Sequence, residues 1–345
     1  MSLRDEIAEQ PQALRRFLAD GPDQVAPVVR ALAERGVESL LIAARGSSDH
    51  AAIYAQYVFG ARHRLPVALA TPSLITLYGV EPRFGNSAVI GISQSGASPD
   101  VVAVVTAARR QGVPTIAITN TPGSPLAGAA VHAIDLRAGP ETAVAATKTY
   151  TAELVALALL SAELAGDDDA RAAVMGLPEV VAASLESADE VERIARRRGS
   201  MTASVVLGRG FEYATAREWA LKVKELAHVV ADPYSAADFQ HGPLALLEPG
   251  FPVLAVAPSG KAEPGMVELL ADMRSRFDVD LVVLSDRDQA LGIGTDGVRL
   301  PAGVPDWLMP IVSIVPCQLF ALHLALARGL DPDSPRHISK VTLTR

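Results

Sequence analysis

The chain has 345 residues, enough for about two domains, and its composition of 49% hydrophobic and 20% charged residues is that of a globular protein with buried cores. A formal net charge of −8 argues against the basic surface that nucleic acids or anionic membranes require. The single cysteine, Cys317, permits no internal disulfide and no thiolate metal cluster, which favours a reducing, cytoplasmic setting. Residues 1–6 include the acidic Asp5 and Glu6 and lack the apolar core of a secretory signal.

Apolar spacing predicts a helical lead-in over residues 5–35, in two pieces that break near Gly21 and Pro22. From Gly36 onward, short apolar runs alternate with longer helical stretches, which is typical of βαβ units and a parallel sheet. We expect a long apolar helix from about residue 143 to 164 to close this half. The predicted strands of the first half are residues 39–44, 66–70, 88–92, 115–119 and 131–136.

The same pattern starts again in the second half of the sequence. Arg45-Gly46 recurs as Arg209-Gly210 and Ser95-Gly96 as Ser259-Gly260, each just past a predicted strand and each at an offset of 164 residues. The sequence therefore predicts a tandem α/β duplication, with the charged residues 186–198 between the halves. The predicted strands of the second half are residues 204–207, 228–231, 252–256, 281–284 and 297–300.

One uncharged run, residues 307–327, is long enough to cross a membrane. It contains Pro310, Pro316, Gln318 and His323, so we expect a buried helix and no membrane span.

Two loops of the first half are rich in hydroxyl groups and follow predicted strands, at residues 45–50 and 93–100. Ser98 followed by Pro99 indicates a helix start, with Ser98 as the N-cap. Because ligands collect at the carboxyl ends of parallel strands, such loops suit a phosphate; an ordinary polar loop with a good cap remains the alternative. Thr147, at another predicted helix start, could add a hydroxyl.

Other motifs fail on their context. Residues 292–297 match the glycine pattern of a dinucleotide site, but no helix follows, so we expect a turn. Residues 91–95 lack the final glycine of a hydrolase nucleophile elbow, and the seven histidines show no metal-ligand spacing. We therefore expect no metal.

Glu218, Lys222 and Glu225 lie on one face of a helix predicted from about residue 213 to 226. Spacing alone favours a solvated salt-bridge ladder. The loop at residues 232–243, however, places His241 shortly after this helix, and a carboxylate with an imidazole can move protons near neutral pH. The tail after residue 331 carries Lys340, for which a frayed terminus is the ordinary expectation.

These residues resemble the sugar isomerase (SIS) family, specifically the isomerase half of the glutamine:fructose-6-phosphate aminotransferases. The resemblance implies an α/β chain of tandem SIS domains, each a five-stranded parallel sheet flanked by helices in a flavodoxin-like three-layer arrangement. It places a helical lead-in at 1–35, SIS domains at 36–185 and 195–330, and an active-site tail at 331–345. The segments that carry it, in the family's order, are residues 6–11, 93–96, 220–226, 241–246 and 333–340.

The resemblance also implies a homodimer without cofactor, whose active sites lie near the interface and draw on the partner's His241 loop. Glu225 would shuttle a proton between C1 and C2, and Lys222 would assist it. His241 would open the sugar ring, and Lys340 would reach the C2 carbonyl as a Schiff base or an ion pair. The backbone at Val144 and Ala145 would touch sugar hydroxyls, and the sugar phosphate would be held by Ser47, Ser93, Gln94, Ser95, Ser98 and Thr147.

The sequence departs from the aminotransferases in three ways. It shows no glutaminase domain, Ala146 stands where they usually have serine, and residues 45–50 resemble the loop of stand-alone amino-sugar-phosphate deaminases. Because free ammonia is scarce, we expect deamination of glucosamine 6-phosphate to fructose 6-phosphate and ammonia. The alternatives are a fructosamine-6-phosphate deglycase, an ammonia-dependent aminotransferase-like enzyme, an aldose–ketose phosphosugar isomerase, and a non-catalytic sugar-phosphate sensor.

Overall fold

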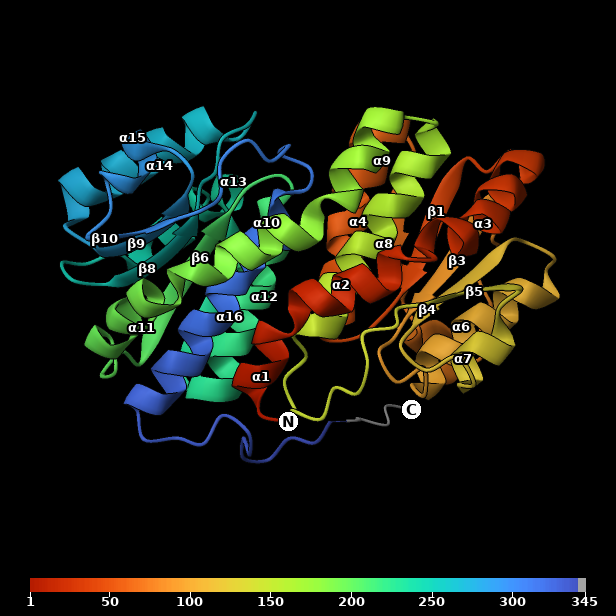
Figure 1. Ribbon diagram of the computed structural model, residues 1–345, viewed down its shortest axis with the longest axis horizontal. Helices are drawn as coiled ribbons and strands as arrows, with labels where there is room; N and C mark the ends of the chain where they lie inside the picture. The colour runs from red at the N-terminus through yellow and green to blue at the C-terminus, as the bar shows by residue number, and fades with distance from the viewer. Residues whose placement is uncertain (341–345) are drawn as a thin grey trace. The chain divides into compact units, whose positions relative to one another are not determined.

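The computed structural model describes residues 1–340 and divides into two compact units (Figure 1). The first unit contains residues 9–142, 146–178 and the end of the chain from Ser339, and the second contains residues 1–8, 143–145 and 179–338. The last five residues of the predicted tail, 341–345, lie outside the described residues.

The first unit is built on a five-stranded parallel sheet in the order β2-β1-β3-β4-β5. Its central strands β3 and β4 are short, mainly apolar runs that are buried on both faces, as a parallel sheet covered by helices requires. Leu40 of β1 pairs with Ala88 of β3, and Ile42 with Ile90. The strands are β1 (Ser39–Ala43), β2 (Val67–Leu69), β3 (Ser87–Ile92), β4 (Thr115–Thr119) and β5 (His132–Asp135).

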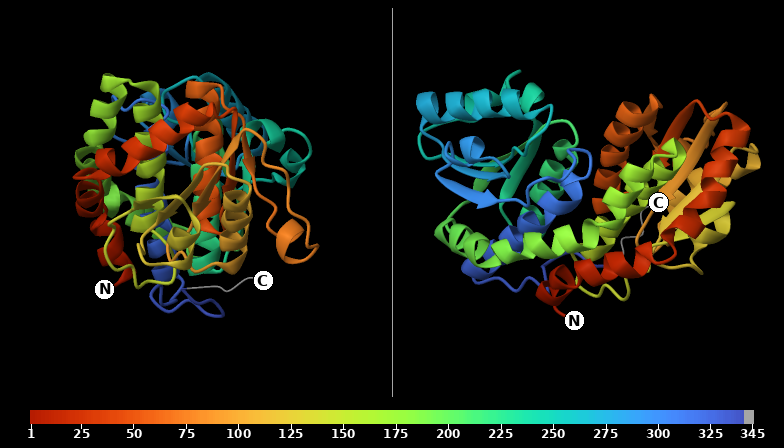
Figure 2. Two further views of the ribbon diagram at one scale, coloured as in Figure 1. Left: turned by 90° about the vertical axis from the view of Figure 1, so that its right-hand side faces the viewer. Right: turned by 45° about the horizontal axis from the view of Figure 1, so that its top comes forward.

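Helices cover both faces of this sheet (Figure 2). The apolar helix predicted from residue 143 begins only at Lys148, because residues 143–147 form a loop whose backbone is held by side chains. The helices of the first unit are α2 (Gln10–Leu18), α3 (Gly21–Arg35), α4 (Ser47–His63), α5 (Ser73–Thr76), α6 (Pro99–Arg110), α7 (Pro125–Ala129), α8 (Lys148–Ala165) and α9 (Asp168–Met175), and α10 (Leu177–Ser184) leads into the second unit.

The lead-in forms three helices where two were predicted, because α1 (Leu3–Ala8) is separate from α2 and belongs to the second unit. The predicted break near Gly21 and Pro22 is confirmed, because α2 ends at Leu18 and α3 begins at Gly21, where proline in the first turn costs no hydrogen bond.

The second unit repeats the architecture, with sheet order β10-β9-β8-β6-β7, all parallel. Its strands are β6 (Ala203–Gly208), β7 (Val230–Ser235), β8 (Pro252–Val256), β9 (Asp280–Ser285) and β10 (Asp296–Arg299). Its helices after α10 are α11 (Ala188–Arg197), α12 (Glu212–Ala227), α13 (Ala236–Phe239), α14 (Glu263–Phe277), α15 (Asp288–Leu291) and α16 (Met309–Ala327), with short 3-10 turns η1 (Leu185–Ser187) and η2 (Pro243–Leu246).

Two predictions in this unit need comment. The strand predicted at 228–231 starts later, at Val230, because His228 adopts a left-handed conformation (φ 56°) that ends α12. Residues 292–295 form the expected turn, and the last two residues of the motif, Asp296 and Gly297, already belong to β10.

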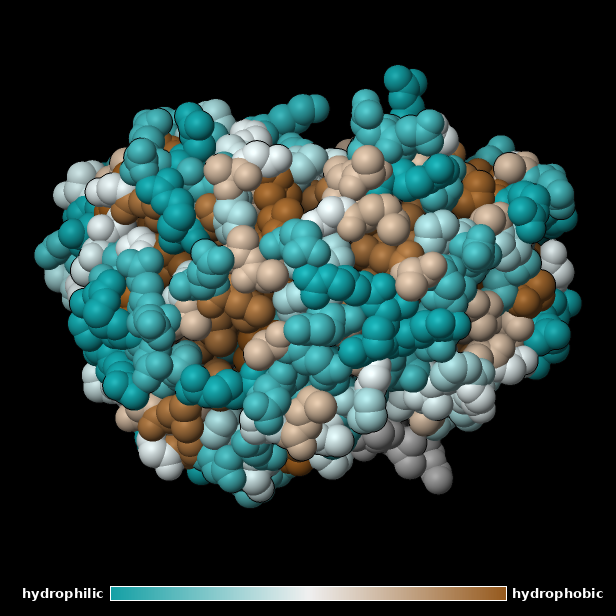
Figure 3. Space-filling view, in the orientation of Figure 1, coloured by the Kyte–Doolittle hydropathy of each residue, from teal (hydrophilic) through white to brown (hydrophobic). Residues whose placement is uncertain are grey.

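The apolar run at the end of the second half folds as α16. By length and composition this helix could cross a membrane, but 94% of its most apolar 18-residue window is buried inside the protein. This burial agrees with the predicted core helix. The face in Figure 3 is mainly hydrophilic, with apolar residues scattered between polar ones.

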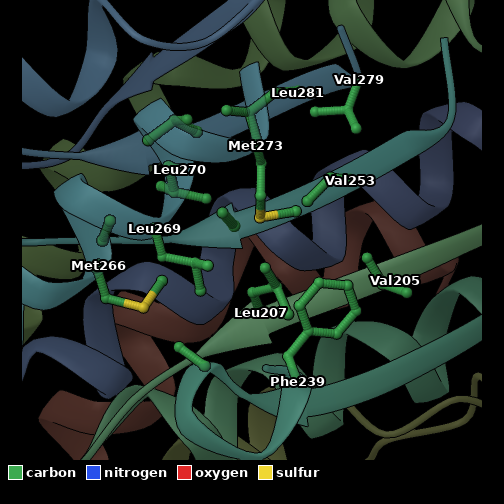
Figure 4. Packing of buried hydrophobic residues seen from close by; sticks show 14 of the residues in the cluster. Val205, Leu207, Phe239, Val253, Met266, Leu269, Leu270, Met273, Val279 and Leu281 are labelled. Carbon is green, nitrogen blue, oxygen red and sulfur yellow. The ribbon is translucent and has the colours of Figure 1, made fainter. Parts of the chain in front are cut away.

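Side chains from β6, β8 and β9 pack against α14 and α13 to form a core of the second unit (Figure 4). Leu207, Val253, Met273 and Phe239 are fully buried there. Each such side chain stabilises the fold by about 1.5–3 kcal/mol. This packing fixes the carboxyl ends of the strands from which the loops of the second unit emerge.

Strand and helix positions confirm the duplication. β1 begins at residue 39 and β6 at 203, β5 at 132 and β10 at 296, and α6 at 99 and α14 at 263, so each pair is 164 residues apart. The glycines of the repeated dipeptides share left-handed backbones, with φ 56° at Gly46 and 63° at Gly210, and 60° at Gly96 and 139° at Gly260. Such angles favour glycine, which explains the recurrence of these residues.

Candidate active site

The loop after β1 turns sharply into α4. Gly46 has a positive φ that permits this turn, and Ser47 is the first residue of the helix. The next hydroxyl, Ser48, is buried and donates a hydrogen bond to Glu153 Oε1 of α8 at 2.8 Å. Ser47 is thereby left at the half-buried rim of the loop.

The loop after β3 folds around its own serines. The Gly96 N–H donates to Ser93 Oγ at 3.2 Å, and the Ala97 N–H donates to Ser95 Oγ at 3.3 Å. A Cβ at Gly96 would overlap Ser124 Oγ, so only glycine fits this position. Ser98 stands at the predicted N-cap of α6, but its side chain makes no capping hydrogen bond, which leaves the hydroxyl available to a ligand.

An ion pair joins these two loops. Arg45 Nε, in the first loop, donates to Asp100 Oδ2 at the start of α6 at 2.7 Å. Both loops follow neighbouring parallel strands, β1 and β3, from which the chain departs toward opposite edges of the sheet. This is the switch point where open parallel sheets bind ligands, and two helix N-termini lie beside it. The sequence indicated both loops but not the ion pair.

A third part of the first unit centres on Glu141, which the sequence did not single out. Its Oε1 accepts hydrogen bonds from the N–H groups of Thr147 and Thr149 at 3.0 and 3.1 Å. Its Oε2 accepts from the Thr149 hydroxyl at 2.7 Å and from Lys340 Nζ at 2.6 Å. The carboxylate is fully buried, whereas the Lys340 side chain is 21% exposed. Glu141 therefore holds both the loop before α8 and the predicted tail lysine.

Val144 and Ala145 belong to the second unit, where the N–H of the preceding Ala143 donates to Glu6 Oε1 of α1 at 3.2 Å. The lead-in helix thus helps to shape this loop. Ala145 is buried and Val144 is half-buried.

The three predicted charges on α12 form a buried arrangement and not a solvated ladder. Lys222 Nζ lies 3.2 Å from Glu218 Oε1 and 2.5 Å from Glu225 Oε2. The side chains of Glu218 and Lys222 are at most 1% exposed, while Glu225 is 25% exposed. Burial alone would lower the pKa of Lys222, but the charges of Glu218 and Glu225 outweigh it and raise that pKa above its usual value. Lys222 is therefore a fixed positive charge that orients the more exposed carboxylate.

His241 lies apart from this arrangement. It follows α13 in an exposed turn, where its backbone N–H donates to the Asp238 carbonyl at 3.0 Å. Across residues 1–340, no hydrogen bond or ion pair joins His241 to Glu225. The structure therefore brings together Glu218, Lys222 and Glu225, but not the imidazole.

The described part of the chain contains no group of three or more histidine, cysteine, aspartate or glutamate side chains placed to hold a metal ion. The chemistry available at these sites is that of hydroxyls, backbone N–H groups, carboxylates and ammonium groups.

Comparison with known proteins places these features in a family. The SIS domain model matches residues 35–162 and 203–328. A glutamine–fructose-6-phosphate aminotransferase (isomerizing) of Pyrococcus horikoshii is 38% identical over 97% of this chain and 56% of the relative. The chain thus spans about half the length of the curated relatives it matches.

Two solved structures are similar over nearly the whole fold. A provisionally assigned phosphosugar isomerase of Silicibacter pomeroyi is 36% identical with a TM-score of 0.85, covering 96% of this chain and 99% of that one. The C-terminal domain of a glucosamine-fructose-6-phosphate aminotransferase of Francisella tularensis is 27% identical with a TM-score of 0.86, covering 96% and 98%. The two matched segments, one in each half of the duplication, show that the chain belongs to the SIS domain family.

Proposed function

We propose that this chain is a phosphosugar-isomerising enzyme that converts glucosamine 6-phosphate and water to fructose 6-phosphate and ammonia. The observation that carries the proposal is the arrangement on α12, where a buried ammonium orients the partly exposed carboxylate of Glu225. A surface salt-bridge ladder would not need a buried lysine, whereas a proton-transfer site needs a carboxylate held in place.

The phosphate would be held by neutral donors. Ser47, Ser93, Gln94, Ser95, Ser98 and Thr147 supply hydroxyl or amide groups, and the N-termini of α4 and α6 supply backbone N–H groups. In a chain of net charge −8, such a local cluster is how an anion can be bound. The Val144 and Ala145 backbone would contact the sugar hydroxyls.

The reaction then needs one proton shuttle. In the open-chain aldehyde form, Glu225 removes the proton from C2 while O1 takes up a proton, and the electrons form an enolamine across C1 and C2. The same carboxyl returns its proton to C1 while the amino nitrogen releases one, which leaves a hydroxyl at C1 and an imine at C2. Water adds to this imine, ammonia leaves, and the ketone of fructose 6-phosphate remains. Lys222 Nζ, 2.5 Å from Glu225 Oε2, holds this side chain in position for the proton transfer.

Lys340 and His241 take the remaining roles. Lys340 donates to Glu141 at 2.6 Å, and this contact supports an ion-pair role near C2, because an amine nucleophile would have to lose both the proton and the contact. His241 is exposed and apart from Glu225, which supports its supply by a second copy of the chain in a homodimer, where it would open the sugar ring.

The proposal is supported by the relatives and by residues of the chain itself. The similar proteins named above are aminotransferases described as isomerizing and a provisional phosphosugar isomerase, and both names support an isomerisation of a phosphosugar by this chain. The deaminase form rests on the loop at residues 45–50 and on Ala146.

The test is a screen of the purified chain with glucosamine 6-phosphate, galactosamine 6-phosphate, a fructosamine 6-phosphate and glucose 6-phosphate. We expect equal amounts of ammonia and fructose 6-phosphate from the first. Glu225→Gln should bind the sugar phosphate without turnover, while Lys224→Gln, an exposed neighbour on the same helix, should react normally. Interconversion of glucose 6-phosphate without ammonia would make the chain an aldose–ketose isomerase, and an absolute need for an N-linked amino acid would make it a deglycase. Binding without any turnover would indicate a sensor and refute the proposal.

A further inference from the structure

A pocket of about 110 Å³ opens in the second unit, at the carboxyl ends of β6 and β8. These strands are the counterparts of β1 and β3, so the pocket occupies the switch point of the second sheet. The residues of the proposed active site form no part of its lining.

The walls of this pocket are mainly apolar. Phe211, Val256 and Met266 line it, and its floor carries the buried carboxyl of Glu212. One oxygen of Glu212 accepts a hydrogen bond from Ser313 Oγ at 2.8 Å, and the other has no hydrogen-bond partner in the described chain. Burial raises the pKa of Glu212 to about 7, against hydrogen bonds from Thr215 and Ser313, so this floor is only partly negative near neutrality.

The charges at the mouth differ from those of the first repeat. There, Arg45 is paired with Asp100. The residues 164 positions later are Arg209 and Pro264, so the second repeat has no aspartate at the position of Asp100. Arg209 extends over the first turn of α14, with Nη1 3.3 Å from where a Cβ on Gly265 would lie. Within residues 1–340 no carboxylate pairs with Arg209.

A second cation, Lys261, stands where the first repeat has Ala97, and it too has no ion-pair partner among the described residues. Of the acidic residues at the mouth, Glu263 is paired with Arg287 at 3.4 Å, which leaves Asp306 as the opposing charge. The mouth therefore carries an excess of positive charge, in a chain whose net charge is −8.

We propose that this pocket is a second ligand site, for a small phosphate monoester whose body packs on the apolar wall. Arg209 and Lys261 hold the phosphate dianion, and the N-termini of α12 and α14 border the same space. The first repeat offers neutral hydroxyls at its switch point and the second offers charges, so the two sites recognise their ligands differently. The site does not depend on the proposed function.

The two tryptophans of the chain, Trp219 and Trp307, both lie in the second unit, and Trp307 follows the pocket residue Asp306. A Trp219→Phe protein therefore reports on this pocket by the fluorescence of Trp307 alone. We would titrate it with fructose 6-phosphate, glucose 6-phosphate and inorganic phosphate up to about 10 mM, where even a millimolar site fills. Calorimetry on the same proteins counts the sites.

We expect a saturable fluorescence change, and a calorimetric site that Arg209→Gln or Lys261→Gln weakens by about tenfold or more. Both side chains are exposed, so the variants should fold, and Arg276→Gln at the far end of α14 is the matched control. Absence of any site that responds to these two substitutions, with or without a fluorescence change, would overturn the proposal. Failure of the deaminase assay alone would leave it standing.

Discussion

Glu141 binds both Lys340 and the loop before α8, so a substitution at this position can break the contact with Lys340 and keep the contacts with the loop. In Glu141→Gln, the amide oxygen can still accept from the N–H groups of Thr147 and Thr149. The amide NH₂ then faces Lys340 Nζ and the Thr149 hydroxyl, and this hydroxyl can turn to accept from the amide instead of donating. The substitution therefore removes one charge-assisted hydrogen bond and keeps the loop. Glu141→Ala removes all four contacts of the carboxylate.

The expected magnitudes follow from the geometry. A buried hydrogen bond to a charged group contributes about 1.5–3 kcal/mol, and the partial exposure of Lys340 places this one somewhat below that range. Glu141→Gln should thus lower the free energy of unfolding by roughly 1 kcal/mol, and Glu141→Ala by roughly 3 kcal/mol because buried N–H groups lose their acceptor. Chemical denaturation measures both values.

Turnover should respond more strongly than stability if Glu141 positions Lys340 for the reaction. We expect Glu141→Gln and Lys340→Met to reduce kcat for glucosamine 6-phosphate by similar factors, and the double variant to be no worse than either. Glutamine keeps the shape of the Glu141 side chain and removes its charge. A loss of kcat in Glu141→Gln therefore reports the positioning of Lys340 and not the support of the fold. Independent, multiplicative losses, or a normal kcat in Glu141→Gln beside an inactive Lys340→Met, would refute the reasoning.

Three further predictions concern stability and reactivity. Gly96→Ala should lower the free energy of unfolding by roughly 2–4 kcal/mol and weaken sugar-phosphate binding, because its Cβ would overlap Ser124. Gly112→Ala is the control: Gly112 has φ 71° but no neighbour within 4 Å, so chemical denaturation should show a loss of only about 1 kcal/mol. Burial raises the pKa of Glu212 from 4.5 to about 7, so its protonated form stabilises the fold fully below pH 4.5. This contribution to the free energy of unfolding should decline by at most roughly 3 kcal/mol as the pH rises through 7. Chemical denaturation at a series of pH values should therefore give a flatter stability profile for Glu212→Gln than for the wild type. Burial also raises the pKa of the Cys317 thiol, so a thiol reagent should modify it only at the rate of unfolding; rapid labelling of native protein would contradict this.

The central strands were predictable because they are short, mainly apolar runs between breakers; β4 and β8 have the predicted bounds. The edge strand β7 was misplaced because it contains Asp232 and Pro233, which an edge strand tolerates but a local pattern does not favour. The start of α8 was placed too early because its apolar approach looks helical, while its backbone N–H groups are taken by Glu141.

The candidate site, too, was predictable only in part from the sequence. The spacing of Lys222 and Glu225 indicated a shared helix face, but the burial that separates a proton-transfer site from a solvated ladder depends on packing far along the chain. The contact of Lys340 with Glu141 joins residues 199 apart, and the Arg45–Asp100 pair joins residues 55 apart. No local pattern encodes such pairs, because they follow from the order of strands in the sheet and the loops that this order brings together.

The central claim, that Glu225 moves a proton between C1 and C2 of a hexosamine 6-phosphate, is tested most directly by reaction in D₂O. The product is followed by NMR, which detects deuterium at C1 of fructose 6-phosphate wherever the shuttled proton has exchanged with solvent. We expect the wild-type chain to form product with partial deuterium at C1, and Glu225→Gln to form none although it binds the sugar phosphate. Product formation by Glu225→Gln at the wild-type rate, or no product from the wild-type chain, would contradict the assignment.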